Sequence, residues 1–169
     1  MILVAIGANL RDAAGRPPLE TCRWAAARLA RLPICCGTGL RLVGLSRWYR
    51  TAPVPASEQP DYINGVALLA GEAEPHAMLA ALHGIEAAAG RVRGAPNAAR
   101  TLDLDLLAID GLVVAEPGLQ LPHPRMQDRA FVLAPLRDVA PGWRHPVLGR
   151  TAGQLLAAVG AGNVRALAA

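Results

Sequence analysis

The order of strand and helix patterns along the chain limits its fold more than any other feature. Two segments carry apolar residues at helical spacing, 17–33 and 74–90. Short apolar runs that suit strands lie before, between and after them, at 2–6, 39–51, 62–71 and 101–109. The order is therefore β-α-β-β-α-β. It predicts a ferredoxin-like α+β domain with a mainly antiparallel four-stranded sheet and helices packed on it.

The rest of the chain predicts smaller elements and no second domain. Residues 112–123 are typical of a small hairpin, 128–141 of a short helix, and 151–160 of a last helix. No repeat or linker interrupts the 169 residues, and 53% of them are hydrophobic. A chain of this length can bury one sizeable core. We therefore expect a single domain over residues 1–169.

All 17 basic residues are arginine, and the formal net charge is +4. A guanidinium is a planar fork that contacts phosphate or carboxylate through two hydrogen bonds, and it does not act as a base. Without lysine, the chain has neither a Walker P-loop nor a protein-kinase lysine. The modest positive excess fits a nucleic acid, a small polyanion such as a nucleotide, or simply an arginine-rich surface.

The start of the chain and its cysteines indicate a cytoplasmic protein. No basic region precedes the apolar run at 2–6, and no uncharged apolar run approaches the roughly 18 residues that a membrane helix needs. Cys22, Cys35 and Cys36 are odd in number and lack metal-binding spacing. We expect them to be reduced thiols.

The strand pattern TLDLDLLAI places two acids within an apolar run. Because strand side chains alternate, Asp103 and Asp105 share one face, with Cα atoms about 6.6 Å apart. The opposite face carries Leu102, Leu104 and Leu106. Two carboxylates this close repel each other unless a cation lies between them. The pattern fits a solvated face paired with arginines, and equally a platform for one or two Mg²⁺ ions, which prefer oxygen ligands.

The loop before these aspartates is basic. The sequence GRVRGAPNAAR places Arg91, Arg93 and Arg100 immediately upstream of Asp103 and Asp105. A nucleoside triphosphate requires guanidinium forks for its phosphate oxygens and metal ions for the remaining charge. Two metal ions about 3.5–4 Å apart could bridge the oxygens of a polyphosphate. The combination favours a nucleotide site over ordinary surface arginines.

Several longer motifs in order carry a resemblance to a known family. They are AIGANL, YRTAPV, QPDYINGVA, GIEAAAGRVR, ARTLDLDLLAIDG and LPHPRMQDRAFVLAPL. From the first strand to about Pro141, the chain resembles the 6-hydroxymethyl-7,8-dihydropterin pyrophosphokinase family of folate biosynthesis. The resemblance implies transfer of pyrophosphate from ATP to the hydroxymethyl oxygen of the pterin, with release of AMP. It also implies two Mg²⁺ ions and a ferredoxin-like αβα fold.

The resemblance implies roles for particular residues. Asp103 and Asp105 match the metal ligands, and Arg91 and Arg100 match the arginines that stabilise the transition state. The positions that match the ATP contacts are Glu86, Arg93, His123 and Arg129. The positions that match the pterin pocket are Gly7, Asn9, Thr51, Pro53, Tyr62, Asn64 and Phe131. As isolated residues, the aromatic side chains and the histidine fit ordinary packing, and only the motifs change that interpretation.

The chain departs from the family pattern in two loops. The family's mobile loop often carries a tryptophan or the sequence GPR before the strand, whereas this loop reads PNAAR and has no aromatic residue. The hairpin segment EPGLQLPH lacks the family's basic residue, and Pro124 follows the histidine. These departures concern the nucleotide contacts and the lid over the substrate, not the reaction.

Two other functions fit parts of the pattern. A basic RNA-binding ferredoxin-like module would need exposed aromatic residues on its central strands, and GVALLAG and TLDLDLLAI offer none. A magnesium-dependent phosphodiesterase could use the same aspartates, and AMP release that requires the pterin would distinguish it. We expect small-molecule partners, ATP and the dihydropterin, and neither nucleic acid nor membrane. We expect a monomer, with a dimer left open.

Overall fold

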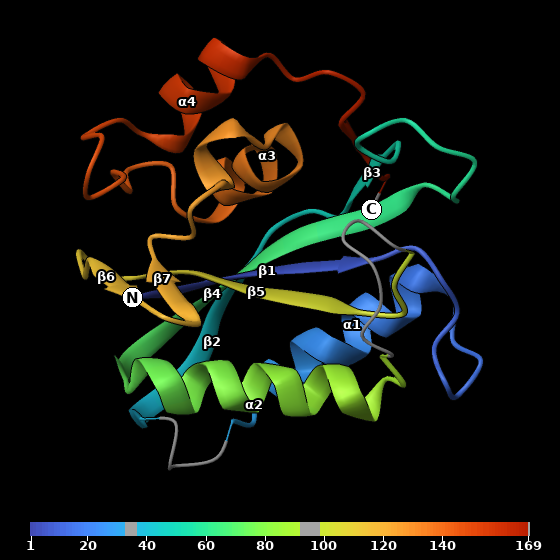
Figure 1. Ribbon diagram of the computed structural model, residues 1–169, viewed down its shortest axis with the longest axis horizontal. Coiled ribbons are helices and arrows are strands. Elements are labelled where there is room, and N and C mark those ends of the chain that lie inside the picture. Colours follow the sequence, from blue (N-terminus) through green and yellow to red (C-terminus); the bar gives the residue numbers. More distant parts are fainter. Residues whose placement is uncertain (33–36, 92–98, 169) are drawn as a thin grey trace.

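The computed structural model describes residues 1–32, 37–91 and 99–168. This part of the chain forms three layers, with a β-sheet between two pairs of helices (Figure 1). None of the described helices is long and apolar enough to cross a membrane. Cys35, Cys36 and Arg93 lie outside the described residues, together with most of the basic loop that precedes Arg100.

Within the described residues the sheet has six strands, not the four that the sequence pattern predicted. The strands are β1 (Ile2–Ala8), β2 (Gly37–Leu45), β3 (Tyr49–Thr51), β4 (Tyr62–Ala73), β5 (Asp103–Ile109) and β8 (Arg165–Ala166). Their order is β5-β1-β4-β3-β8, while β2 also pairs with β4, and every pairing is antiparallel. The prediction of a mixed fold with an antiparallel sheet is confirmed, and the predicted number of four strands was wrong. The ferredoxin-like topology stays a prediction.

Two local features account for the additional strands. The predicted strand at 39–51 is divided into β2 and β3, which pair with opposite halves of the long strand β4. Between them Ser46 stays bonded to Val66, because its backbone N–H donates to the Val66 carbonyl at 3.0 Å and its Oγ accepts from the Val66 N–H at 2.9 Å. The second feature is the C-terminal strand β8, which adds to the free side of β3.

Gly65 of β4 has no side chain, and this makes room for the break between β2 and β3. Gly65 keeps a regular register opposite Ile6 of β1, so it marks no bulge on that side. A Cβ atom at Gly65 would lie 2.6 Å from the Trp48 ring, which covers the strand where β2 ends and β3 begins. Only a residue without a side chain allows this close approach.

The helices cover the two faces of the sheet (Figure 1). One face carries α1 (Pro18–Leu29) and α2 (Pro75–Ala88), and the other carries α3 (Ala130–Val139) and α4 (Ala152–Val159). In β1, Ile2, Val4 and Ile6 pack toward α1 and α2, while Leu3 packs toward α3. This burial on both faces explains why the N-terminal strand is apolar almost throughout.

Local caps set the ends of several helices. Pro18 and Pro75 stand in the first turns of α1 and α2, where a missing N–H costs nothing. Thr151 and Gln154 form a capping box at the start of α4. Gly90, the last residue of the predicted helical segment 74–90, follows α2 with φ of 78°.

Residues 112–123 contain the predicted hairpin. Strand β6 (Val114–Glu116) pairs with β7 (Leu119–Leu121), and a 3-10 turn (Met126–Asp128) then leads to α3. The backbone N–H of His123 donates to the Leu107 carbonyl of β5 at 2.8 Å. This bond fixes the exit of the hairpin beside the strand that carries the two aspartates.

Candidate active site

Asp103 and Asp105 lie at the start of β5 and project from the same face of the sheet. The alternating leucines point the other way, into the core formed with α1 and α2. They are Leu102, Leu104 and Leu106, and each is at most 4% exposed. The predicted alternation is confirmed. It brings two carboxylates to the face of the sheet that α3 covers.

Asp103 is paired with two guanidinium groups. Nη1 of Arg91 lies 2.7 Å from Oδ1 of Asp103, and Nη1 of Arg100 contacts Oδ2. The backbone N–H of Arg100 donates to Oδ1 of Asn9 at 2.8 Å, which ties this arginine to the end of β1. The carboxylate expected to bind metal is therefore neutralised by the two arginines expected to bind phosphate.

Glu86 on α2 holds Arg91 in this arrangement. Its side chain is buried, Oε1 accepts a hydrogen bond from the backbone N–H of Leu104 at 2.7 Å, and the same oxygen contacts Nη1 of Arg91. Burial raises the pKa of Glu86, while the Leu104 N–H and the charge of Arg91 oppose that rise. Glu86 thus links α2, β5 and Arg91 at one point.

Asp105 faces a histidine and a further arginine. Nε2 of His123 and Nη1 of Arg129 each lie 3.8 Å from Oδ2 of Asp105. Burial and the neighbouring charge of Asp103 raise the pKa of Asp105. Burial lowers the pKa of His123, and Asp105 opposes that effect. Nδ1 of His123 accepts from the backbone N–H of Arg125 at 3.2 Å, so the proton of the neutral ring lies on Nε2, toward Asp105.

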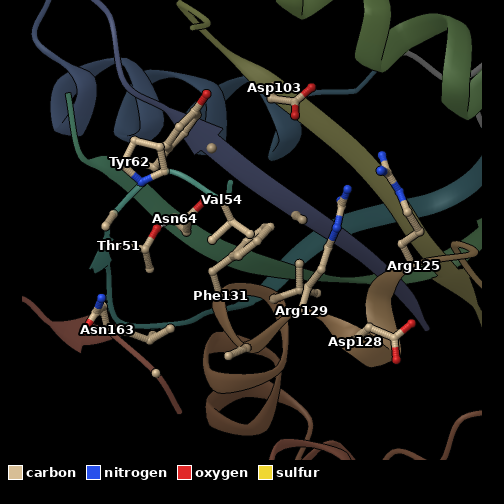
Figure 2. Close-up of a pocket in the computed structure, with 18 of the residues that line it drawn as sticks. Thr51, Val54, Tyr62, Asn64, Asp103, Arg125, Asp128, Arg129, Phe131 and Asn163 are labelled. Atoms are coloured by element: carbon tan, nitrogen blue, oxygen red, sulfur yellow. Dashed lines mark hydrogen bonds between the residues drawn. The ribbon is translucent and has the colours of Figure 1, made fainter. Parts of the chain in front are cut away.

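Two cavities meet at the aspartates. The first, of about 670 Å³, lies between β3, β4 and α3 and is drawn in Figure 2. The second, of about 820 Å³, lies between α2, β5 and the β6–β7 hairpin. The side chains that line both cavities are Arg100, Asp103, Asp105, His123 and Arg125. A ligand in one cavity therefore meets a ligand in the other beside the carboxylates.

The first cavity combines flat apolar faces with buried polar groups. Tyr62 and Phe131 line it from different elements, and the guanidinium of Arg129 lies 5.5 Å from the centre of the Phe131 ring (Figure 2). Asn64 and Thr51 are buried, and Nδ2 of Asn64 donates to Oγ1 of Thr51 at 2.7 Å. Aromatic faces beside an amide and a hydroxyl suit a flat heterocycle with a polar edge.

Comparison with known proteins agrees with this geometry. The sequence model of the 7,8-dihydro-6-hydroxymethylpterin-pyrophosphokinase (HPPK) family matches residues 3–141. The chain belongs to the HPPK family. The match ends just after α3, so it includes both aspartates and every residue that the motifs assign to a site.

Relatives in the HPPK family are similar over most of their length. A protein of Pseudomonas aeruginosa named 2-amino-4-hydroxy-6-hydroxymethyldihydropteridine pyrophosphokinase is 41% identical over 157 residues, which are 93% of this chain and 90% of the relative. A protein of the same name from Synechocystis is 37% identical over 91% of this chain and 73% of the relative. These matches extend past the end of the family model.

Solved structures share the fold. Wild-type HPPK-DHPS of Plasmodium falciparum with STZ-DHP superposes with a TM-score of 0.65 and 12% identity, over 93% of this chain and 42% of that chain. The structure with pteroate gives a TM-score of 0.63 and 13% identity, again over 93% and 42%. This chain thus spans less than half the length of the Plasmodium chain. At this identity the similarity concerns the fold alone.

Most positions that the HPPK motifs assign to the pterin come together. Those that line the first cavity are Gly7, Thr51, Pro53, Tyr62, Asn64 and Phe131. Asn9 lines neither cavity in the described part of the chain. Its Nδ2 donates to the Pro60 carbonyl at 3.1 Å and its Oδ1 accepts from Arg100. Asn9 therefore joins β1 to the loops at the rim of the cavity.

The positions that the HPPK motifs assign to ATP are divided between the cavities. Glu86 and Arg91 line the second cavity, Arg129 lines the first, and His123 lines both. Arg93 lies outside the described residues. Among the described residues, Glu86 bonds to Arg91 and to the Leu104 backbone, which makes it a support for the arginine as well as a wall of the cavity.

The structure adds residues that the sequence reasoning missed. They are Arg125 at the border of both cavities, Asp128 and Asn163 in the first, and His83 and Gln120 in the second. Arg125 lies two residues after His123 within the motif LPHPRM, so the motif itself held a signal. Asn163 lies beyond the family match, and no pattern in the sequence marks it.

The two carboxylates of the site fit magnesium ions whose coordination shell the substrate would complete. Among the described residues, no group of three or more His, Cys, Asp or Glu side chains could hold a metal ion. Mg²⁺ commonly takes one or two carboxylates and completes its shell with water and phosphate oxygens. Asp103 and Asp105 offer that pair where the two cavities meet.

Proposed function

We propose that this HPPK family member transfers the pyrophosphoryl group of ATP to the hydroxymethyl group of 6-hydroxymethyl-7,8-dihydropterin, releases AMP and serves folate synthesis. The observation that carries this proposal is the meeting of two cavities at Asp103 and Asp105, with guanidinium groups on both sides. A group can pass between two bound substrates only when their reacting atoms lie next to each other, as they would where these two cavities meet.

The first cavity suits the pterin. Its aromatic walls, Tyr62 and Phe131, offer faces on which a flat ring can stack, while the bonded pair of Asn64 and Thr51 supplies polar atoms at the ring edge (Figure 2). The hydroxymethyl group of a pterin held this way would point toward the shared border. The acceptor oxygen would then lie beside Asp103 and Asp105.

The second cavity suits ATP, with its triphosphate at the border. Arg91 and Arg100 present guanidinium forks there, and both are paired with Asp103. We propose that the phosphate oxygens take over these forks and that Asp103 and Asp105 hold two Mg²⁺ ions. When bound, these ions would neutralise phosphate charge and draw electrons from the β-phosphorus.

The reaction asks little proton chemistry of the protein. The hydroxymethyl oxygen bonds to the β-phosphorus and releases its proton to water, the bond from that phosphorus to the bridging oxygen of the α-phosphate breaks, and AMP leaves with the electron pair. Arg91 and Arg100 stabilise the negative charge that develops, and Glu86 fixes the position of Arg91. The Nε2–H of His123 points into the same region and can donate to a phosphate oxygen.

One assay tests the proposal. Purified protein is mixed with ATP, MgCl₂ and 6-hydroxymethyl-7,8-dihydropterin, and AMP and the pterin diphosphate are measured by chromatography. We expect both products in equal amounts, and neither product when the pterin or the magnesium is left out. AMP or ADP release that does not depend on the pterin would instead identify a phosphodiesterase or an ATP hydrolase.

A further inference from the structure

The wall of the first cavity includes a segment beyond the HPPK family match. The match ends at residue 141, yet Val159 to Val164 line the cavity together with Phe131 and Thr51. Asn163 is the polar side chain of that segment (Figure 2). The C-terminal part of the chain therefore contributes to the site that the family motifs build.

The segment is anchored at both ends. Helix α4 packs on α3 and ends where the Gly160 N–H donates to the Leu156 carbonyl at 2.8 Å. A turn follows, closed by the Val164 N–H on the Ala161 carbonyl at 3.2 Å. Strand β8 then pairs with β3. Directly after it, the Leu167 N–H donates to the Trp48 carbonyl at 2.8 Å.

The strand register places Asn163 at the polar end of the cavity. Arg165 lies opposite Arg50, and Ala166 lies opposite Tyr49. Continuing this antiparallel register by one residue sets Val164 opposite Thr51, and Asn163 comes next (Figure 2). Thr51 is the hydroxyl that already accepts from Asn64, so Asn163, from the turn before β8, lines the same cavity as this polar pair from β3 and β4.

The Asn163 amide is available to a ligand. The residue is exposed, and its side chain forms no hydrogen bond with any other described residue. A primary amide offers two N–H donors and a carbonyl acceptor. The edge of a pterin carries an amino group, ring nitrogens and a carbonyl oxygen, which alternate as donors and acceptors. An amide matches such an edge better than a charged or apolar side chain does.

We infer that Asn163 is a specificity-determining residue that hydrogen bonds to the polar edge of the pterin from a cavity wall supplied by the C-terminal segment. This inference rests on the proposed function, because it names a contact of the same substrate. It assigns to residues 159–164 a role in substrate recognition in addition to their role in packing.

The test compares Asn163→Ala with Arg165→Ala, a control on the same segment whose exposed side chain does not line the cavity. Dissociation constants for the dihydropterin are measured by titration calorimetry with a non-hydrolysable ATP analogue and MgCl₂ present, and KM values are measured for both substrates. We expect Asn163→Ala to weaken pterin binding and raise the pterin KM about three- to tenfold, the effect of one lost hydrogen bond. The ATP KM should not change, and Arg165→Ala should match the wild type.

The outcomes separate this inference from the proposed function. Wild-type protein that neither binds the pterin nor forms its diphosphate contradicts the proposed function. A wild type that turns over, together with unchanged pterin affinity in Asn163→Ala, contradicts only the role of Asn163. Equal weakening by both variants also contradicts it, since the segment would then act through its fold. Thermal unfolding of both variants checks that each is folded.

Discussion

Nη1 of Arg91 lies 2.7 Å from Oδ1 of Asp103, so a proposed phosphate ligand and a proposed metal ligand neutralise each other. The same nitrogen contacts Glu86, and Arg100 contacts the other oxygen of Asp103. A substrate that carries both phosphate and metal can separate this pair, because its phosphate can bind Arg91 while its metal can bind Asp103. The arrangement keeps these charges paired and in position for that exchange.

Replacing Asp103 with alanine should abolish the reaction and preserve the fold. The change removes one of two proposed metal ligands and leaves Arg91 and Arg100 without their carboxylate. We expect the rate of AMP formation to fall by at least about 10³-fold. Glu20→Ala, which removes an exposed acid on α1, is the control and should retain full activity. Wild-type turnover in Asp103→Ala would refute the proposed site.

Two variants of Glu86 separate its structural and positioning roles. Glu86→Ala leaves the Leu104 N–H without its acceptor, so we expect the free energy of unfolding to fall by about 2–4 kcal/mol. Glu86→Gln keeps an acceptor for Leu104 and loses the charge that holds Arg91. It should unfold near the wild-type temperature but lower kcat about tenfold, with pterin affinity unchanged. Denaturant unfolding and steady-state kinetics test the two effects, and a Gln variant with unchanged kcat would remove the positioning role.

Arg125 should bind phosphate, although the sequence reasoning did not select it. Its side chain is exposed at the border of both cavities and makes no hydrogen bond or ion pair with the described residues. Arg125→Ala should raise the KM for ATP by about ten- to a hundredfold, the usual effect of a lost charge-assisted contact. Arg23→Ala, which removes an exposed arginine on α1, is the matched control. Added salt should weaken ATP binding less in Arg125→Ala than in the wild type, and equal salt dependence would argue against a phosphate contact.

Asp12, in the loop between β1 and α1, should make the stability of the protein depend on pH. Burial favours a raised pKa for Asp12, but hydrogen bonds from Arg16, Ala14 and Thr21 outweigh it and lower the pKa below 3.8. An acid with a lowered pKa stabilises the fold above its unfolded pKa, and this contribution is lost as the pH falls through the folded value. Asp12→Asn should therefore cost about 2 kcal/mol at pH 7, which is roughly 4–8 °C in Tm.

Thermal unfolding between pH 2.5 and pH 7 checks this prediction. The difference in Tm between wild type and Asp12→Asn should be constant near neutral pH and should shrink as the pH falls below about 4. A difference that stays the same throughout would mean that Asp12 acts through its shape and not through its charge. Activity assays at neutral pH should show that both proteins use the same substrates.

Local patterns in the sequence were sufficient to predict helices packed on an antiparallel sheet and to place Asp103 and Asp105 on one face of a strand. The alternation of leucines with Asp103 and Asp105 depends only on strand geometry, and the structure confirms it. Prolines at the starts of α1 and α2 act through the backbone next to them, so the starts of both helices were predicted to within one residue, whereas α1 ends at Leu29, before the predicted end at residue 33. Of the seven positions that the ordered motifs assign to the pterin, six line the first cavity.

Only the tertiary structure determined the pairings between distant segments. The splitting of residues 39–51 depends on how the Trp48 ring and Ser46 meet β4, and the addition of β8 depends on a turn after α4. Neither event leaves a periodic signal, because each is decided by packing between parts of the chain that are far apart in sequence. For the same reason, the border position of Arg125 and the cavity-facing position of Asn163 emerged only once β5, the hairpin and the C-terminal segment were placed together.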